Sequence, residues 1–354
     1  MTFESFLGNP GAVASLRGTL ARGEAPGAML FTGPEGVGKK TLAQMFAQSL
    51  NCAEPRDGVF CGQCRACRKV EEMLAAARDD LALRRESKDA GKRVEGLVYF
   101  DVQLLGPITR YILTEQIREL RRVAYTRPFE LRRRVFIIDQ AQAIHWQAVD
   151  LLLKVLEEPP ETTTIILVCP QAQELRPTVR SRCRRVQFAP VEDAVISARL
   201  PESLPAAERT LVTRLAAGRV AKALTFDLAA YLERRRPWLE FLEGVAARPG
   251  TTPNWNAVFD AAKSLTENRD ELEVTLGIGY DLLRDLVQTL DGAEPRVSDP
   301  DLLPRLKGWA ARLQLGGIAR LKDGLDQAYR LQVRNVNPQL GFEALAVELA
   351  ERSA

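Results

Sequence analysis

The sequence predicts an α/β domain with a parallel sheet, followed by two domains built only of helices. Three observations lead to this fold class. Short apolar runs alternate with helical patterns over roughly the first 190 residues, a glycine-rich loop follows the first of these runs, and strand signals fade afterwards. Apolar strands separated by helices form parallel sheets with helices on both faces, because each helical crossover covers one face of the sheet.

Three apolar runs carry the prediction of the sheet. Residues 28–33, 133–139 and 162–170 are short and apolar, as buried strands are. Apolar positions recur at helical spacing over 148–158, and this helix should end there because two prolines follow it. Residues 76–114 interrupt the alternation with a dense run of charges, for which we expect an exposed helix end and a loop.

The rest of the chain is predicted to be helical. Helical patterns run over 271–290, 316–338 and 342–352, and a smaller helical unit precedes them. We therefore expect a sheet domain, a small helical domain and a helical C-terminal domain. Their predicted boundaries are 1–190, 191–233 and 234–354.

Composition and charge indicate an ordinary globular protein. Hydrophobic residues make up 46% of the 354 residues and charged residues 27%. No apolar run reaches the roughly 18 residues of a membrane span, and the first residues lack the basic start and apolar core of a secretory signal. We therefore expect a cytoplasmic protein with no membrane partner. The net charge of +3 does not by itself announce a nucleic-acid binder.

A glycine-rich loop after the first strand matches most of the phosphate-binding (P-loop) pattern. Its backbone N–H groups and Lys39 can contact phosphate oxygens, helped by the dipole of the next helix. An accidental glycine-rich turn is the alternative, but the position between a strand and a helix favours the functional interpretation. Lys40 stands where a hydroxyl normally binds magnesium, and Thr41 is rotated by about 100° around the helix. The residues of this degenerate loop are Gly33, Gly36, Gly38, Lys39, Lys40 and Thr41.

Four cysteines lie close together in the sequence. Cys61, Cys64 and Cys67 form a C-x2-C-x2-C pattern, and Cys52 precedes them by nine positions. Four thiolates can close a tetrahedral zinc site without an open position, which makes the expected zinc structural. A disulfide and an iron–sulfur cluster are the alternatives, and the first is disfavoured in a cytoplasmic chain.

The order of these motifs resembles that of a known family. The glycine-rich loop and the four cysteines are followed by VFIIDQAQ (135–142), LLLKVLEEPPE (151–161) and RSRC (180–183). This order is similar to the bacterial DNA polymerase III clamp loader, an assembly of AAA+ proteins. Two of its subunit types carry the zinc module, the gamma/tau motor and delta-prime, and VRNVNPQLGFEALAVELA (333–350) resembles the end of the delta-prime collar. The resemblance implies an AAA+ domain with an inserted zinc module around 52–67, a helical lid and a helical collar.

Departures from the motor pattern favour the delta-prime type. A motor has Thr in place of Lys40, and Glu after the Walker B aspartate, where Gln140 follows Asp139 here. A neutral amide cannot take a proton from the attacking water. The positions aligned with the sensor Thr and the sensor Arg are Cys169 and Ala221. The four changes imply a subunit with little or no ATPase activity of its own, which leaves binding of ATP or ADP open; an ATP-hydrolysing gamma/tau-type motor is the alternative.

The resemblance assigns a catalytic role to Arg182. The arginine of Ser-Arg-Cys acts in this family as a finger that reaches the gamma-phosphate in a neighbouring motor subunit. A surface arginine in a basic patch is the alternative interpretation. The implied partners are the gamma/tau and delta subunits in a hetero-pentamer, the sliding clamp (beta), and primed template DNA within the assembly. An unrelated zinc-containing AAA+ adaptor is a further alternative.

Three arginines at helical spacing are candidates for contact with DNA. Arg118, Arg121 and Arg122 recur in EQIRELRRV, so they could face phosphates and give affinity without reading the base sequence. A solvated helix face is the equal alternative.

Overall fold

The computed structural model describes residues 3–89, 91–246, 254–268, 271–334 and 337–351. The chain divides into two compact units, of which the first comprises Met1–Ile196 and Gly218–Lys222. The second comprises Ser197–Ala217 and Ala223–Ala354. The predicted division of the chain into sheet, lid and collar domains stays a prediction.

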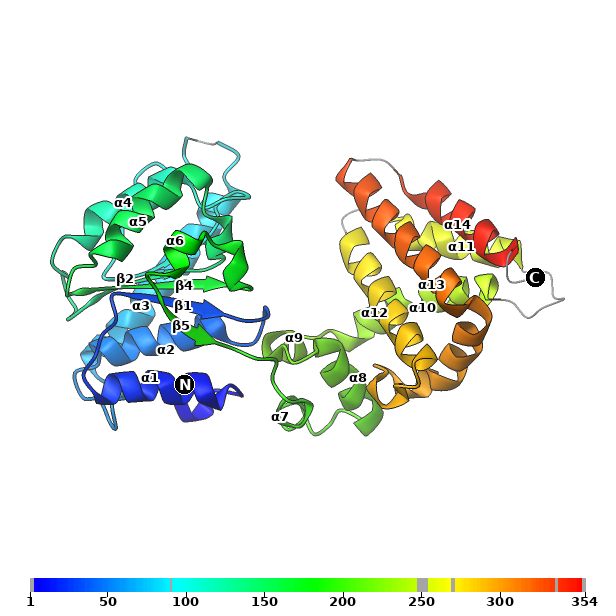
Figure 1. Cartoon of the computed structure of the whole chain (residues 1–354), viewed down its shortest axis with the longest axis horizontal. Coiled ribbons are helices and arrows are strands. Elements are labelled where there is room, and N and C mark those ends of the chain that lie inside the picture. Colours follow the sequence, from blue (N-terminus) through cyan, green and yellow to red (C-terminus); the bar gives the residue numbers. More distant parts are fainter. Residues whose placement is uncertain (1–2, 90, 247–253, 269–270, 335–336, 352–354) are drawn as a thin grey trace. The chain divides into compact units, whose positions relative to one another are not determined.

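The first unit contains one parallel sheet with the strand order β2-β3-β4-β1-β5 (Figure 1). The strands are β1 (Ala28–Thr32), β2 (Val102–Leu105), β3 (Arg134–Ile138), β4 (Thr163–Cys169) and β5 (Arg184–Gln187). The three strands predicted from the apolar runs are confirmed as β1, β3 and β4. The sequence prediction missed β2 and β5, which have four residues each and add the two edges of the sheet.

The predicted loop at 76–114 is wrong at β2. Helix α3 (Arg65–Glu86) extends into this segment, as the predicted helix end requires, but Val102–Leu105 is a fully buried strand beside β3. The strand has only four residues, so its sequence shows no recognisable hydrophobic periodicity after the charged residues that precede it. Its place in the sheet depends on pairing with β3, where Val102 lies opposite Val135.

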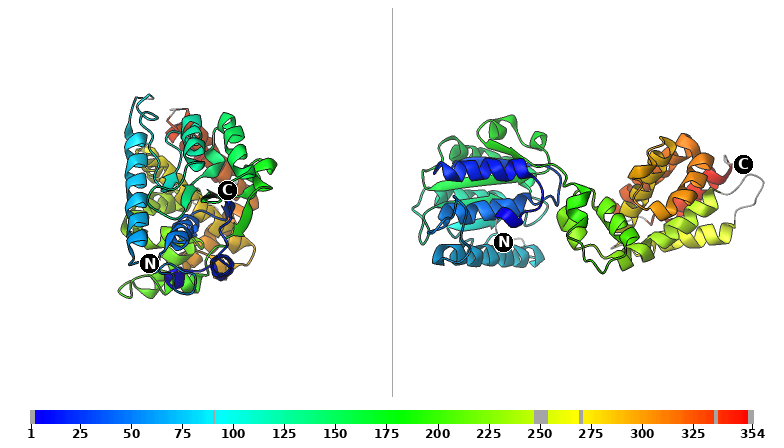
Figure 2. Two further views of the ribbon diagram at one scale, coloured as in Figure 1. Left: turned by 90° about the vertical axis from the view of Figure 1, so that its left-hand side faces the viewer. Right: turned by 90° about the horizontal axis from the view of Figure 1, so that it is seen from below.

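Helices cover both faces of this sheet (Figure 1, Figure 2). One face packs on α1 (Pro10–Ala21), α2 (Lys39–Asn51) and α3. The other face packs on α4 (Thr114–Ala124), α5 (Val149–Glu157) and the short α6 (Pro177–Arg180). Successive strand residues alternate between the two cores, so every central strand is buried on both sides, as parallel sheets require.

A buried ion pair fixes the connection between α4 and β3. Asp101 accepts the backbone N–H groups of Phe129, Glu130 and Leu131 at 2.7–3.1 Å and pairs with Arg134 at 2.9 Å. Burial alone would raise the pKa of the Asp101 carboxyl, but these hydrogen bonds outweigh it and hold the pKa below the ordinary value. The carboxylate therefore stays charged and holds the loop in one conformation.

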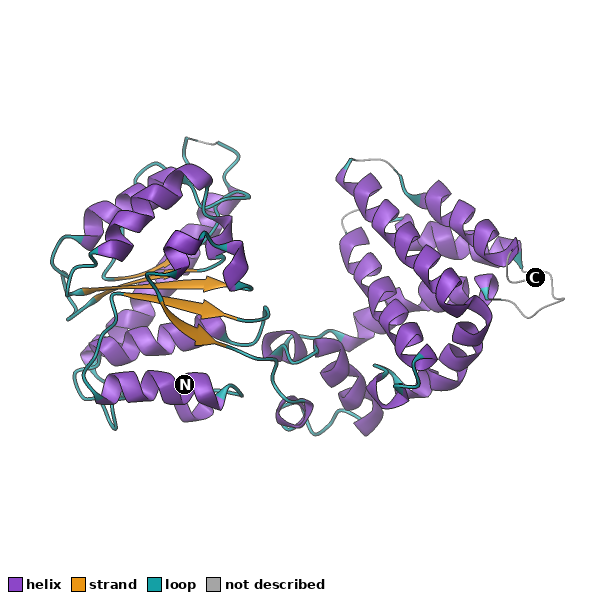
Figure 3. Cartoon of the chain, in the orientation of Figure 1, coloured by secondary structure: helices purple, strands orange, loops and turns teal. Residues whose placement is uncertain are grey.

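The second unit consists of helices (Figure 3). They are α8 (Ala206–Ala216), α10 (Leu228–Val245), α11 (Trp255–Thr266), α12 (Leu272–Leu290), α13 (Leu303–Val333) and α14 (Gln339–Glu351). Two short helices, α7 (Asp193–Ser197) and α9 (Val220–Leu224), lie where the chain passes between the units. The 3₁₀ turns among the described residues are Phe3–Ser5, Ala141–Ala143, Trp146–Ala148, Ala172–Glu174, Glu294–Arg296 and Pro300–Leu302.

An aromatic cluster lies in the core of the second unit. The rings of Trp238, Phe241 and Phe342 meet edge to face with centroids 5.6–6.1 Å apart, which joins α10 to α14. The predicted helical patterns over 271–290 and 342–352 are confirmed by α12 and α14. Residues 335–336 of the delta-prime-like C-terminal motif lie outside the described residues. No helix in the described ranges combines the length and the apolar character that crossing a membrane requires.

Candidate functional site

The glycine-rich loop joins β1 to α2, the strand–loop–helix arrangement that its sequence predicts. The backbone φ angles of Gly33, Gly36 and Gly38 are 145°, 76° and 97°, values that residues other than glycine rarely adopt. The loop is also closely packed. A Cβ atom on Gly33 would lie 2.3 Å from the carbonyl oxygen of Phe188, and one on Gly38 would lie 2.8 Å from the ring of Phe6. The tight turn and the packing therefore both require glycine.

Lys39 lies beneath this loop. The residue is 7% exposed, and its ammonium group donates hydrogen bonds to the carbonyl oxygens of Gly33 and Pro34. Burial lowers the pKa of Lys39, and the nearby carboxylate of Glu35 acts in the opposite direction. The side chain is placed where it can contact an anion held by the loop.

Lys40 and Thr41 follow on the first turn of α2. Lys40 Nζ lies 3.1 Å from Asp139 Oδ2, at the carboxyl end of β3. Asp139 Oδ1 accepts the backbone N–H of Gln140 at 3.1 Å. The structure thus pairs two of the predicted site residues that lie far apart in the sequence, and Thr41 is half-buried beside them on the helix.

The other two departures from the motor pattern lie beside the same loop. Cys169 ends β4, which neighbours β1, and burial raises the pKa of its thiol to about 11. The backbone N–H of Ala221 donates to the carbonyl oxygen of Gly36 at 3.1 Å. The structure therefore brings Lys40, Asp139 and both sensor positions around one loop.

Arg182 lies in the turn between α6 and β5. Its guanidinium pairs with Glu157 Oε1 at 2.7 Å and donates to the carbonyl oxygen of Thr178 at 2.7 Å. The arginine side chain is 33% exposed and that of Glu157 is 47% exposed. A pair this exposed contributes only about 0–1 kcal/mol to stability, so an incoming anion can replace Glu157 at little cost.

The four cysteines predicted to bind zinc lie in one cluster. Their sulfur atoms all lie within 4.8 Å of one another, and the Sγ atoms of Cys52 and Cys64 are 3.9 Å apart. A tetrahedral zinc ion with bonds of about 2.3 Å to sulfur would place its ligands about 3.8 Å apart. The cluster joins the end of α2 to the start of α3, because Cys52 follows α2 and Cys67 lies in the first turn of α3.

Backbone hydrogen bonds lower the pKa of Cys61 and Cys64 and favour their thiolates, whereas burial raises the pKa of Cys52 and Cys67. The N–H of Cys61 donates to the sulfur of Cys52, and that of Cys64 donates to the sulfur of Cys61, both at 3.3 Å. Burial opposes ionisation of Cys64, but hydrogen bonds from the N–H groups of Cys67 and Ala53 outweigh it and lower the pKa of Cys64 to about 6. The donor set and its spacing fit a zinc ion.

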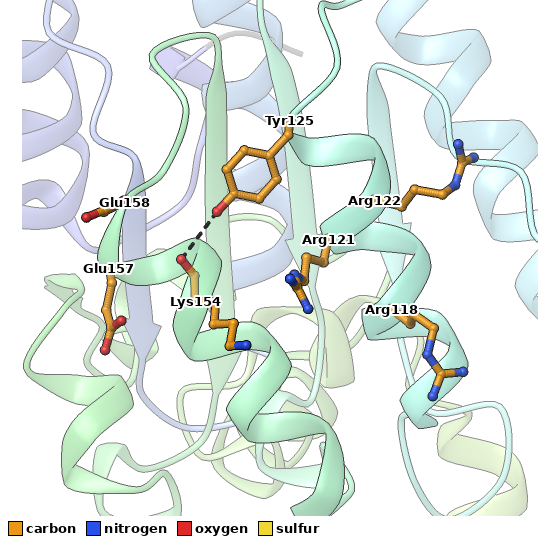
Figure 4. Close-up of a pocket in the computed structure, with 7 residues that line it drawn as sticks. All are labelled: Arg118, Arg121, Arg122, Tyr125, Lys154, Glu157 and Glu158. Atoms are coloured by element: carbon orange, nitrogen blue, oxygen red, sulfur yellow. Dashed lines mark hydrogen bonds between the residues drawn. The ribbon is translucent and has the colours of Figure 1, made fainter.

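A basic pocket of about 640 Å³ lies between α4 and α5 (Figure 4). It is lined by Arg118, Arg121, Arg122, Tyr125, Lys154, Glu157 and Glu158. Figure 4 shows the side chains of Arg121 and Lys154 pointing toward one another, whereas Arg118 and Arg122 point away. Within the described part of the chain, neither Arg121 nor Lys154 forms an ion pair, while Arg122 pairs with Glu119 at 2.6 Å.

Sequence reasoning missed Lys154 and Glu157. Both lie on α5, in a run dominated by leucines, where only the helical spacing of the two charged residues signals that they share an exposed side. Arg182, which pairs with Glu157, lies in the turn after α6, and Arg121, which faces Lys154, lies on α4, so spacing along α5 could not predict these neighbours. All three arginines that the sequence singled out line the pocket, and of these Arg121 points toward Lys154.

Sequence comparisons match this chain to subunits of DNA polymerase III. The family model described as DNA polymerase III, delta subunit, matches residues 8–192. The gamma/tau subunit of DNA polymerase III from Mycobacterium tuberculosis is 30% identical over 187 residues, which cover 53% of this chain and 28% of the relative. The delta' subunit from Pseudomonas aeruginosa is 31% identical over 170 residues, which cover 48% of this chain and 45% of the relative.

Among solved structures, a DNA polymerase III gamma subunit-related protein from Thermotoga maritima matches 96% of this chain and 100% of its own, with 18% identity and a TM-score of 0.44. The matched segments span less than half the length of both curated relatives.

Proposed function

Since the chain belongs to the DNA polymerase III delta-subunit family, we propose that it is a delta-prime-type subunit of the clamp loader that does not hydrolyse ATP itself. It would assemble with gamma/tau and delta subunits in a hetero-pentamer and help to place the sliding clamp on primed template DNA. The relatives include both gamma/tau and delta' subunits. A gamma/tau-type motor is therefore the second candidate.

One observation favours the delta-prime-type subunit over the gamma/tau-type motor. The Lys40 ammonium is paired with Asp139 at 3.1 Å, at the position where a motor binds magnesium between a hydroxyl and this carboxylate. Gln140, next to Asp139, cannot accept a proton from an attacking water. The two changes remove the metal ligand and the base together, so the site lacks the groups that hydrolysis needs.

Arg182 would supply its chemistry to a neighbouring subunit. Phosphoryl transfer builds negative charge on the transferred group, and an arginine provided in trans stabilises it. The exposed pair with Glu157 holds the guanidinium in place until a phosphate takes over from that carboxylate. The chain would thus contribute to catalysis without a working site of its own.

Zinc would be bound by Cys52, Cys61, Cys64 and Cys67 and would act only as a structural link. All four positions are filled by protein ligands, which leaves none for a reacting water. The ion would hold the start of α3 against the end of α2.

The basic pocket would hold a phosphate of the DNA backbone between Arg121 and Lys154. Within the described residues neither cation forms an ion pair, although Glu157 and Glu158 line the same pocket, so both can contact a phosphate. Contacts of this kind position the duplex without reading its sequence.

The function is tested by measuring ATP hydrolysis on the isolated chain and on a loader reconstituted with gamma/tau and delta. We expect the isolated chain to show no turnover above background, and the complete assembly to hydrolyse ATP when clamp and primed DNA are added. Brisk magnesium-dependent turnover by the isolated chain would instead identify a motor. Failure to co-assemble with gamma/tau and delta would point to an unrelated adaptor.

For the basic pocket, we expect the double variant Arg121→Ala/Lys154→Ala to weaken binding of primed DNA by the assembled loader equally for all sequences. The plot of log affinity against log salt should lose about one unit of slope for each lost phosphate contact. Fluorescence anisotropy at several salt concentrations measures both quantities. Arg17→Ala is the matched control, because Arg17 pairs with Glu4 at 3.6 Å and is not among the residues that line the pocket. An unchanged salt slope in the double variant would contradict the assignment.

A further inference from the structure

The magnesium ion that a phosphate-binding loop normally uses does not fit the side chains of this loop. Lys40 Nζ lies 3.1 Å from Asp139 Oδ2, and the second oxygen of this carboxylate accepts the backbone N–H of Gln140 at 3.1 Å. Magnesium requires oxygen ligands in a near-octahedral arrangement. An ammonium group has no lone pair to offer and repels a divalent cation. The Lys40–Asp139 pair therefore keeps the metal from the carboxylate that would bind it.

The rest of the loop keeps what a phosphate group needs. The loop leads directly into α2, whose first N–H groups have no partner within the helix and attract anions. Lys39 is 7% exposed, and within the described residues no carboxylate forms an ion pair with it. Its ammonium group instead donates to two carbonyl oxygens of the loop. The loop thus holds a buried ammonium group that contacts carbonyl oxygens and, among the described residues, forms no ion pair with a carboxylate.

Two ammonium groups therefore stand where the motor pattern provides one ammonium group and one metal ion. We propose that this chain binds the polyphosphate of a nucleoside di- or triphosphate without a divalent cation, with the Lys40 ammonium in place of the metal. Lys40 keeps its contact with Asp139 and turns its remaining N–H donors toward the phosphates, while Lys39 contacts them from beneath the loop. The proposed function requires no nucleotide in this chain, so this inference goes beyond it. The bound nucleotide would be a structural ligand that is not turned over.

The test is isothermal titration calorimetry of the full chain with ADP and with ATP, once in EDTA and once in excess magnesium. We expect the same affinity in both buffers for the unchanged protein. In the variant Lys40→Thr, which restores the hydroxyl of the motor pattern, we expect binding in EDTA to weaken about tenfold or more, because a charge-assisted hydrogen bond is lost. Magnesium should recover much of that loss. Lys263→Thr, at an exposed position on α11, is the matched control and should behave like the unchanged protein.

Three outcomes would overturn the proposal. The first is binding by the unchanged protein that requires magnesium, and the second is no binding of either nucleotide in either buffer. The third is a Lys40→Thr variant that binds equally in both buffers, because Lys40 would then not replace the metal. Circular dichroism of each variant separates lost binding from lost folding. None of these results depends on loader assembly, so the proposed function can stand if this inference fails.

Discussion

Replacing Arg182 by alanine is expected to lower ATP turnover of the reconstituted loader by about 10³-fold or more at the neighbouring site that it completes. Assembly should remain intact, because the side chain forms a surface pair with Glu157 and local hydrogen bonds to the Thr178 carbonyl and the Ser181 hydroxyl. Turnover falls because the negative charge that develops on the transferred phosphoryl group is no longer neutralised. Single-turnover hydrolysis resolves this one site from the other motor sites, and size-exclusion chromatography checks assembly.

Two controls separate a finger from a structural arginine. Glu157→Gln removes the partner of Arg182 in the free subunit, and turnover should be kept, because the phosphate replaces Glu157 in any case. If Arg182 only fixed the turn through this pair, both variants would lose activity alike. Arg176→Ala is the matched surface control, since Arg176 is also exposed and pairs with Asp150 at 3.5 Å. Unchanged turnover in Arg182→Ala would remove this residue from the catalytic role.

Loss of zinc is expected to destabilise the first unit strongly. Binding of structural zinc contributes about 10–16 kcal/mol in zinc-finger peptides, whereas a whole domain is stable by only about 5–15 kcal/mol. Cys67→Ser should abolish zinc binding and lower the melting temperature, because Cys67 is fully buried at the start of α3 and its sulfur faces the other three. Elemental analysis should find one zinc per unchanged chain, and a strong chelator should lower the melting temperature toward that of the variant.

The control for zinc uses a cysteine outside the cluster. Cys183→Ser should keep one zinc per chain, since Cys183 is buried elsewhere in the first unit. A chain that melts at the same temperature with and without chelator and contains no metal would contradict the site. Iron together with visible absorbance would indicate an iron–sulfur cluster, and two missing free thiols without metal would indicate a disulfide.

Much of the sheet could be predicted from the sequence. Strands β1, β3 and β4 are central and fully buried, so each is a continuous apolar run that needs no partner to be recognised. The two edge strands gave no such signal. In β5 only Val186 is buried, and the charged residues around it follow no period. Pairing with β1 decides that this segment is a strand.

The positions of the phosphate loop and of the cysteine cluster could also be predicted from the sequence. Both are built from residues close along the chain, where glycine conformation and ligand spacing restrict the geometry. The sequence likewise showed that Lys40 cannot bind magnesium and that Gln140 cannot accept a proton from water. Both statements follow from the chemistry of each side chain alone.

Only the tertiary structure decided which charges meet. Lys40 and Asp139 are 99 positions apart and are joined because β3 ends beside the start of α2. Arg182, in the turn after α6, meets Glu157 at the end of α5, and Arg121 of α4 faces Lys154 of α5. A single sequence does not show which charged side chains form ion pairs. An ion pair depends on the distance between two side chains in space, and the packing of helices on the sheet sets that distance. The sequence thus determined which side chains stand at each motif position, and the fold decided which of them contact one another, because contacts depend on the packing of helices on the sheet.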